Sequence, residues 1–235
     1  MNCVILQPSY IPWRGYFDQI RKADVFVFYD DVQYDTRGWR HRNRIKTPQG
    51  AHWISIPVHS KGAQSVHIPI NQIRICWDQP WNRKHLMTLT HCYKRAPFFA
   101  KYEPVLEEFY GRQDEFLADF TIALTMAIAS ELGISHTKFL RSSQLGVEGG
   151  QTQRLVKIVQ AVGADTYISG PSAEDYIESE LFGAAGIRLE YMKYGYPEYP
   201  QLYPPFDPQM SILDLLFMVG PDAAKYIWEE GASAK

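Results

Sequence analysis

The stretch VILQPSYIPWRGYFDQIRKADVFVFYDDVQY, residues 4–34, decides the fold. It opens on the apolar run 4–6 and returns to a second apolar run at 25–29. Both runs are continuously apolar, which is typical of strands that are covered on two faces. Residues 15–22 between them can form a helix with an apolar side. A helix that connects two buried strands predicts the start of a parallel α/β sheet.

The last third of the chain repeats this α/β pattern, whereas the middle departs from it. Residues 61–145 combine the short β-like pieces 66–70 and 73–75 with three predicted helices, and we interpret them as a helical insertion. No low-complexity linker divides the chain, so residues 1–235 are expected to form a single α/β domain. The predicted fold is a parallel-sheet, Rossmann-like (nucleotidyltransferase-like) core with a helical insertion packed on it.

Side chains that can cap helices predict where several helices begin and end. Asp114, Thr152 and Ser172 are expected to begin helices, because their side chains can accept hydrogen bonds from free backbone N–H groups. Gly133 and Gly163 are expected to end helices, since glycine readily takes the left-handed conformation that follows a last turn.

Composition limits the classes of function. The formal net charge of −2 gives no overall attraction to nucleic acid or to an anionic membrane. No window reaches the roughly 18 apolar residues of a membrane span, and no leader peptide is expected. Three widely spaced cysteines indicate reduced thiols and predict a cytoplasmic protein. The seven histidines lack metal-ligand spacing, so no metal site is predicted.

Polar and aromatic loops follow three of the predicted strands, at residues 7–15, 30–34 and 169–176. Ligands of open parallel sheets bind beyond the carboxyl ends of the strands. One polar strand end also fits simple exposure to solvent, but three together favour a ligand cleft. In the third loop, Ser169 lacks the Gly-x-Ser-x-Gly context of a hydrolase nucleophile, so Ser169 and Gly170 are expected to donate hydrogen bonds to a ligand instead.

The first loop has the spacing of the segment that opens class I nucleotidyltransferases. In those enzymes two histidines beside a glycine contact the phosphates of ATP, and here Trp13 and Tyr16 take their places around Gly15. The glycine still permits close backbone approach, and a helix N-terminus still favours an anion. A tryptophan cannot neutralise a phosphate. A bound phosphate would therefore need Arg14 or the basic residues downstream.

The basic residues downstream lie in the stretch RGWRHRNRIK, residues 37–46. In an extended chain the alternating cations share one face, and they would suit phosphates or carboxylates: Arg40, Arg42, Arg44 and Lys46. The alternative is a solvated edge strand whose charges pair with the nearby aspartates. His41 and His85 lie among aromatic and charged residues and are candidate acid or base groups.

Five stretches of the chain resemble, in this order and spacing, the motifs of the WbqC-like protein family: QPSYIPWRGYFDQI, ADVFVFYDDVQY, WRHRNRIKTPQG, YISGPSAEDY and SILDLLF. The resemblance covers about residues 3–220. It implies a role in bacterial O-antigen, other polysaccharide or natural-product biosynthesis. The implied reaction is amide-forming transfer or ligation of an acyl or aminoacyl group, such as glycyl, onto an amino sugar or similar amine.

The resemblance and the predicted cleft together give a set of expected site residues. The expected catalytic residues follow the second strand: Asp31, Gln33, His41, Asn43, Arg44 and Lys46. Asp31 is expected to deprotonate the amine, and Arg44 and Lys46 to hold the anionic part of the donor. The expected substrate-binding residues lie in the strand-end loops: Gln7, Ser9, Tyr10, Pro12, Trp13, Gly15, Tyr34, Ser169, Gly170 and Tyr176.

Two alternatives to this transferase remain open. The enzyme could itself adenylate a carboxylate with ATP, or the chain could be a non-catalytic protein that binds a nucleotide or a sugar. In the leading interpretation the partners are a small amine and a donor activated by ATP or beforehand. Aminoacyl-tRNA is one such donor, although the net charge of −2 argues weakly against an RNA partner.

Overall fold

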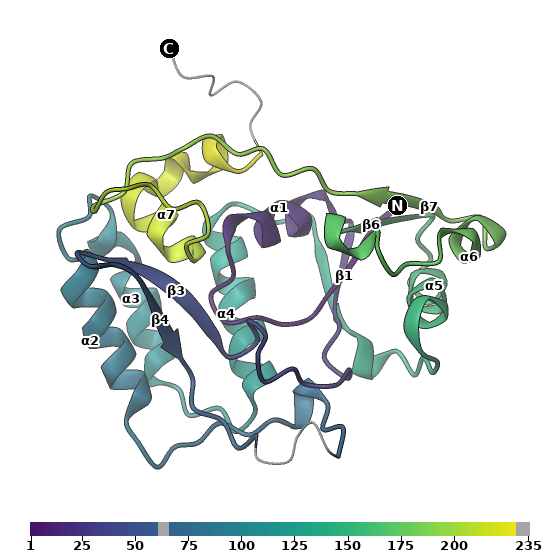
Figure 1. Ribbon diagram of the computed structural model, residues 1–235, viewed down its shortest axis with the longest axis horizontal. Helices are drawn as coiled ribbons and strands as arrows, with labels where there is room; N and C mark the ends of the chain where they lie inside the picture. Colours follow the sequence, from purple (N-terminus) through teal and green to yellow (C-terminus); the bar gives the residue numbers. More distant parts are fainter. Residues whose placement is uncertain (61–65, 229–235) are drawn as a thin grey trace.

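A five-stranded parallel sheet forms the centre of the protein (Figure 1). The computed structural model describes residues 1–60 and 66–228. The strand order is β5-β2-β1-β6-β7, and every neighbouring pair is parallel. The strands are β1 (Asn2–Leu6), β2 (Val25–Phe28), β5 (Lys138–Arg141), β6 (Thr166–Ser169) and β7 (Arg188–Tyr191). The predicted parallel α/β, Rossmann-like class is confirmed.

Helices cover both faces of this sheet, as the continuously apolar strands require. Alternate strand residues such as Val4 and Phe26 join one apolar cluster, which includes side chains of α1 (Arg14–Lys22) and α4 (Leu117–Glu131). Their neighbours, such as Ile5, join the second cluster. That cluster contains side chains of α5 (Gln151–Ala161) and α6 (Ser179–Ala184). The sheet is thus the middle layer of three.

A hairpin and three helices connect β2 to β5. The hairpin pairs β3 (Arg42–Thr47) with β4 (Gly50–Ser55) in antiparallel register. The helices are α2 (Trp81–Tyr93), α3 (Phe99–Gly111) and α4, and near the C-terminus α7 (Ile212–Val219) contacts both α3 and the hairpin strand β3. Pro104 lies inside α3. In the described part of the predicted β-like pieces, only isolated bridges form, such as Val58 with Ile75; residues 61–65 lie outside the described residues.

The structure corrects three predicted helix starts. α4 begins after Phe116, because the Asp114 carboxylate is paired with Arg112 instead of capping the helix. α5 begins after Gly150, and the Thr152 hydroxyl inside it accepts a hydrogen bond from the Glu178 backbone. Ser172 lies within the 3₁₀ turn Pro171–Ala173 and caps no helix. The predicted ends are confirmed: Gly133 and Gly163 follow α4 and α5 with positive φ.

Among the residues that the structure describes, four short 3₁₀ helices are also present: Ile70–Gln72, Ser142–Gln144, Pro171–Ala173 and Gly220–Tyr226. Within the described ranges, we find no helix of sufficient length and hydropathy for a transmembrane span.

A buried polar cluster fastens the loop after β1 to the helices of the insertion. The Tyr10 hydroxyl is 2.8 Å from Nδ1 of His85 and hydrogen-bonds with the Tyr110 hydroxyl. Trp81 packs edge-on against the imidazole. Burial lowers the pKa of His85 to about 4, so the imidazole is neutral at neutral pH. His85 therefore acts as a buried polar contact of the core, away from solvent.

The low pKa of His85 predicts acid sensitivity. The imidazole titrates near pH 6.5 when unfolded and at about 4 when folded, so the unfolded state binds the extra proton between these values. Stability from this group is present above pH 6.5 and is lost as the pH falls. Between pH 7.5 and pH 5 we expect urea unfolding of the wild type to lose roughly 2 kcal/mol more than that of His85→Gln. Equal losses in the two proteins would contradict this assignment.

Candidate functional site

A cleft lies at the point where the order of strand addition in the sheet reverses. From β1 the chain builds outward through β2 and β5 on one side, and then through β6 and β7 on the other. β1 and β6 are neighbours, so Gln7 after β1 and Gly170 after β6 meet at their carboxyl ends. Crevices at such a switch point are the preferred ligand sites of open parallel sheets.

Two cavities meet in this cleft. The first, about 430 Å³, has aromatic walls that include Trp13, Trp39 and Tyr194. The second, about 770 Å³, extends past Tyr29 and Tyr176. Both are lined by the same five residues at their junction: Leu6, Gln7, Arg40, Gly170 and Ser172. The two cavities therefore form one cleft with two compartments.

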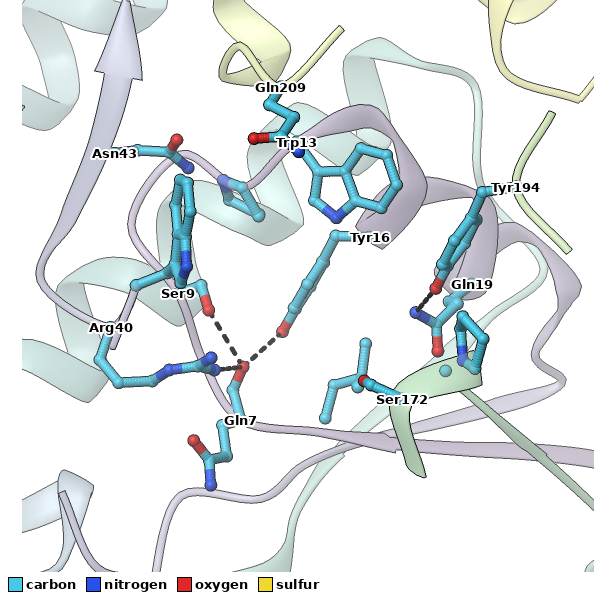
Figure 2. A pocket seen from close by; sticks show the side chains of 15 residues that line it. Gln7, Ser9, Trp13, Tyr16, Gln19, Arg40, Asn43, Ser172, Tyr194 and Gln209 are labelled. Carbon is cyan, nitrogen blue, oxygen red and sulfur yellow. Dashed lines mark hydrogen bonds between the residues drawn. The ribbon is translucent and has the colours of Figure 1, made fainter. Parts of the chain in front are cut away.

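The backbone carbonyl of Gln7 organises the junction, and Figure 2 shows three side chains converging on it. It accepts hydrogen bonds from Arg40 Nη1 at 3.0 Å, from the Tyr16 hydroxyl at 3.1 Å and from Ser9 Oγ at 3.4 Å. Burial lowers the pKa of the Arg40 guanidinium, and the neighbouring Asp35 opposes this effect. A guanidinium stays protonated even so. Arg40 is thus a fixed, partly desolvated cation between the two compartments.

Trp13 covers the N-terminus of α1. It occupies the N-cap position, and its ring lies so close to Gly15 that a Cβ there would come within 2.3 Å of it. The ring also packs edge-on against Tyr194, with 4.9 Å between centroids. The glycine predicted to admit a phosphate admits this indole instead, and Gly15 is absent from the residues lining either cavity. An anion at this helix end would have to displace Trp13.

Asn43 shapes the loop after β1. Its Nδ2 donates to the carbonyls of Tyr10 at 3.1 Å and Ile11 at 2.8 Å, and its Oδ1 accepts from the backbone of Arg44. Ile11 has a φ of +37°, a strained value for a β-branched residue. The buried Asn43 amide therefore holds a loop path that the backbone alone disfavours, while also lining the first cavity.

The other cations predicted to bind an anion instead contact rings and carbonyls of the protein itself. Arg14 is not among the residues that line the cleft; its guanidinium lies over the rings of Tyr196 and Tyr199 and donates to the carbonyls of Pro197 and Tyr226. Arg42 lies over Trp53 on the hairpin. Such contacts fix side chains without leaving them free for a phosphate.

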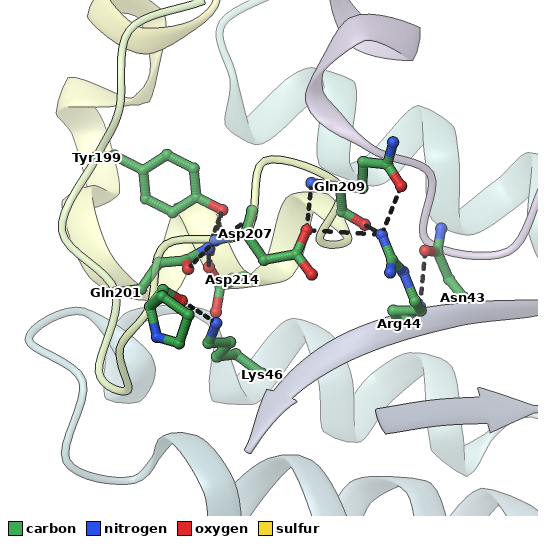
Figure 3. Close-up of polar contacts among 9 residues, drawn as sticks. Asn43, Arg44, Lys46, Tyr199, Gln201, Asp207, Gln209 and Asp214 are labelled. Atoms are coloured by element: carbon green, nitrogen blue, oxygen red, sulfur yellow. Dashed lines mark hydrogen bonds and ion pairs between the residues drawn. The ribbon is translucent and has the colours of Figure 1, made fainter. Parts of the chain in front are cut away.

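Arg44 and Lys46 belong to a separate polar network (Figure 3). Arg44 donates to Gln209 and lies 3.6 Å from an Asp207 carboxylate oxygen. Lys46 is buried and donates to the Pro205 carbonyl, and its charge acts on the nearby Asp214. Both cations anchor the C-terminal segment, and the lining of the cleft contains neither of them.

The buried carboxylate of Asp214 is the centre of this network. It accepts hydrogen bonds, each 2.8 Å long, from Tyr93, Tyr199 and Gln201. Burial raises its pKa, while these donors and Lys46 oppose the rise. Asp214, which lies in the motif SILDLLF, therefore has a structural role: its hydrogen bonds join α7 to α2 and to the C-terminal loop.

Asp31 lies in a third cavity, of about 350 Å³, beside the cleft. Its carboxylate is 2.5 Å from Arg154 Nη2 and accepts a hydrogen bond from Ser142. The Arg154 guanidinium in turn lies over the ring of Tyr29, which lines the second cavity. The predicted base is thus separated from the cleft by an arginine and a tyrosine.

The remaining predicted residues lie in the cleft or in the core, except Gln33, which lies at the surface. Those that line the cleft are Gln7, Ser9, Pro12, Trp13, Asn43, Ser169, Gly170 and Tyr176. Tyr10 and Tyr34 are buried, and the Tyr34 hydroxyl is 2.6 Å from Nδ1 of His41. Gln33 is exposed and forms a β-bridge with Pro69. Residues that line the first compartment but lie outside the expected site set include Tyr16, Gln19, Trp39, Ser172, Tyr194 and Gln209, whereas Arg40 is expected only as one of the alternating anion-binding cations.

The chemistry offered by the cleft is that of amides, hydroxyls, aromatic rings and one guanidinium. Among the described residues lining its two compartments there is no Asp, Glu, His, Lys or Cys. Across residues 1–60 and 66–228, no group of three His, Cys, Asp or Glu side chains is arranged to hold a metal ion. The arrangement suits hydrogen bonding and stacking around a ring-shaped, neutral or anionic ligand.

Comparison with known proteins agrees with the motif resemblance. The model of the WbqC-like protein family matches residues 7–226. An uncharacterised protein of Mycobacterium tuberculosis, Rv1507c, is 42% identical over 225 residues, which cover 95% of this chain and 96% of that protein. No solved structure gives a significant match.

Asn43→Asp tests the role of the amide in shaping the loop. A carboxylate of the same size cannot donate to the carbonyls of Tyr10 and Ile11, which would remain buried without those donors. We expect the free energy of unfolding in urea to fall by about 2–4 kcal/mol. The matched change Gln49→Glu, on the exposed turn of the same hairpin, should stay within about 0.5 kcal/mol of wild type. Similar losses for both variants would refute the role.

Gly15→Ala tests the seating of Trp13. The new methyl group collides with the indole, so we expect a loss of about 1–3 kcal/mol in unfolding free energy. In a Trp13→Ala background the same change meets no ring, and alanine is the better helix former by about 1 kcal/mol. The effect of Gly15→Ala should therefore reverse sign between the two backgrounds. A loss of the same size in both would show that the ring is not the obstacle.

Proposed function

The chain belongs to the WbqC-like protein family, and we propose that it is an amide-forming acyl or aminoacyl transferase that acts on an amino sugar or similar amine. The observation that carries the proposal is the meeting of two compartments at Gln7 and Arg40. A group-transfer enzyme must hold a donor and an acceptor with their reacting atoms in contact. A cleft with two compartments and one shared junction meets that requirement.

In the proposed reaction the neutral amine attacks the carbonyl carbon of an activated ester or thioester. A C–N bond forms, the C–O or C–S bond breaks, and the leaving group keeps the electron pair. The amine proton passes through solvent to the leaving group. Arg40 would donate a hydrogen bond to the carbonyl oxygen, where negative charge develops in the transition state. Its tie to the Gln7 carbonyl fixes it before the reaction, so little reorganisation is needed.

Aminolysis of an activated ester requires a neutral amine and correct alignment more than a strong base. This agrees with a cleft whose described lining contains no carboxylate or imidazole. Asp31, the base expected from the sequence, could act directly only if Arg154 released it. We therefore assign the main rate enhancement to orientation and to Arg40.

The first compartment suits the acceptor. Trp13, Trp39 and Tyr194 offer aromatic surfaces, and the faces of sugar rings pack well against such surfaces. The larger second compartment, with hydroxyls from Ser169, Thr152 and Tyr176, is left for the donor. This assignment brings the amine of the acceptor toward Arg40 from one side and the acyl group from the other.

A pre-activated donor is favoured over adenylation by ATP. Trp13 covers the helix end that would receive the phosphates, and Arg14 is engaged with the C-terminal segment. Exchange of labelled pyrophosphate into ATP, dependent on an amino acid or another carboxylic acid, measures the adenylating alternative. We expect no exchange, and exchange would make the chain an adenylating ligase.

The second candidate function is non-catalytic binding of a sugar or nucleotide. It is favoured by the same absence of acidic, basic and thiol side chains, other than Arg40, from the described lining of the cleft. A ligand that is bound but never consumed, with both an amine and an activated acyl ester present, would favour this function.

The transferase proposal predicts a specific loss in Arg40→Ala. With an aminoacyl thioester and D-glucosamine as substrates, amide formation can be followed by mass spectrometry. Removal of a donor to a developing oxyanion typically lowers the rate by about 10²–10³-fold, and we expect kcat/KM to fall by that factor. The matched control Arg37→Ala, an exposed cation of the same segment, should keep wild-type kinetics. Equal activity of Arg40→Ala and Arg37→Ala would refute the role of Arg40.

A further inference from the structure

A buried hydrogen-bond acceptor in the first compartment has no partner in the described part of the protein. Gln19 lies on α1 and is only 4% exposed. Its Nε2 donates to the Tyr194 hydroxyl at 2.7 Å, whereas its Oε1 is buried without a hydrogen bond. A buried polar atom left unpaired costs about 1–3 kcal/mol, so such atoms are rare and call for an explanation.

The position of Gln19 offers that explanation. Gln19 lines the first cavity, and Figure 2 shows its amide beneath the Tyr194 hydroxyl, on the side of the pocket opposite Arg40. The same hydroxyl lies 3.7 Å from the position of a Cβ at Gly170, so the absence of a side chain there leaves room beside it. Gln19 therefore forms part of the wall of the first compartment beside this space; its oxygen has less than 1 Å² of accessible surface, so a ligand reaches it when the amide rotates.

Tyr194, the hydrogen-bond partner of Gln19, supplies the complementary donor through its hydroxyl. Since Gln19 donates to the Tyr194 oxygen, the proton of that hydroxyl remains available to a ligand. Burial raises the pKa of Tyr194 to about 12, and the nearby Asp18 adds to this, so the hydroxyl keeps its proton at neutral pH. Gln19 and Tyr194 together present one acceptor and one donor side by side. That pair matches a hydroxyl group, which both donates and accepts.

We propose that Gln19 and Tyr194 form a subsite that recognises a ring hydroxyl of the ligand in the first compartment. The ligand class is a saturated, polyhydroxylated ring that packs against Trp13 and carries its amine toward Arg40. The identity of this ligand as the acceptor rests on the proposed function. The hydroxyl recognition itself rests only on the unpaired Gln19 oxygen and the orientation of the pair.

Binding of D-glucosamine and its monodeoxy analogues, measured by ligand-observed NMR and titration, tests the subsite. In the wild type, removal of one particular ring hydroxyl should weaken binding by about 10–100-fold, because Gln19 Oε1 is again left unpaired. Gln19→Leu keeps a similar shape without the acceptor, and Tyr194→Phe keeps the ring without the donor. In each variant the parent sugar and that deoxy analogue should bind within about threefold of one another, since the group that distinguishes them is gone.

The control is Gln209→Ala, which alters another residue lining the same compartment and should keep the discrimination between parent and analogue. Unchanged discrimination in both Gln19→Leu and Tyr194→Phe would overturn the subsite. Failure of the wild type to bind any member of the panel at millimolar concentration would overturn it as well. Discrimination that is present in the wild type and lost in the variants, but without amide formation, would leave the subsite standing and refute the transferase.

Discussion

The amide of Asn43 imposes the constraint on which the cleft depends. It comes from a hairpin inserted between β2 and β5, and it satisfies two carbonyls of the loop that follows β1. That contact holds Ile11 in an unfavourable conformation and sets the path of the chain from Gln7 to α1. The Gln7 carbonyl can then accept hydrogen bonds from Arg40, Tyr16 and Ser9, and the Trp13 ring can lie against Gly15. The β3–β4 hairpin thus completes a site whose other half belongs to the sheet.

Most charged side chains that the sequence suggests for ligand binding instead stabilise the fold. Asp214 is a buried carboxylate held by two tyrosines and a glutamine, and Lys46 lies close enough to act on it. A buried charge is tolerated only when hydrogen bonds and an opposite charge surround it, and here those partners come from separate segments of the chain. The network fixes the C-terminal loop, which carries Tyr194 to the cleft. Arg40 is left as the cation at the junction of the two compartments.

The sequence predicts β1, β2 and β6 because these buried parallel strands read as continuous apolar runs, but it misses β5, whose half-buried residues lie within the stretch read as a helical insertion. It also places the cleft, since Gln7 and Ser169 directly follow such runs. It fails where long-range partners decide the role of a residue. Asp114 and Thr152 look like helix caps, but Arg112 and the Glu178 backbone bind them instead. Nothing local distinguishes Arg40, which reaches Gln7, from Arg44, which reaches Gln209, because both belong to one alternating basic run.

In the proposed function, a single cleft at the β1–β6 junction binds a sugar-like amine between Trp13 and Tyr194 with its nitrogen toward Arg40. A crystal structure of the protein soaked with D-glucosamine would locate the bound sugar. We expect density for the sugar in the first compartment, with a ring hydroxyl within hydrogen-bond distance of Gln19 Oε1. Density in the cavity beside Asp31 and Arg154, or in no part of the cleft, would contradict it.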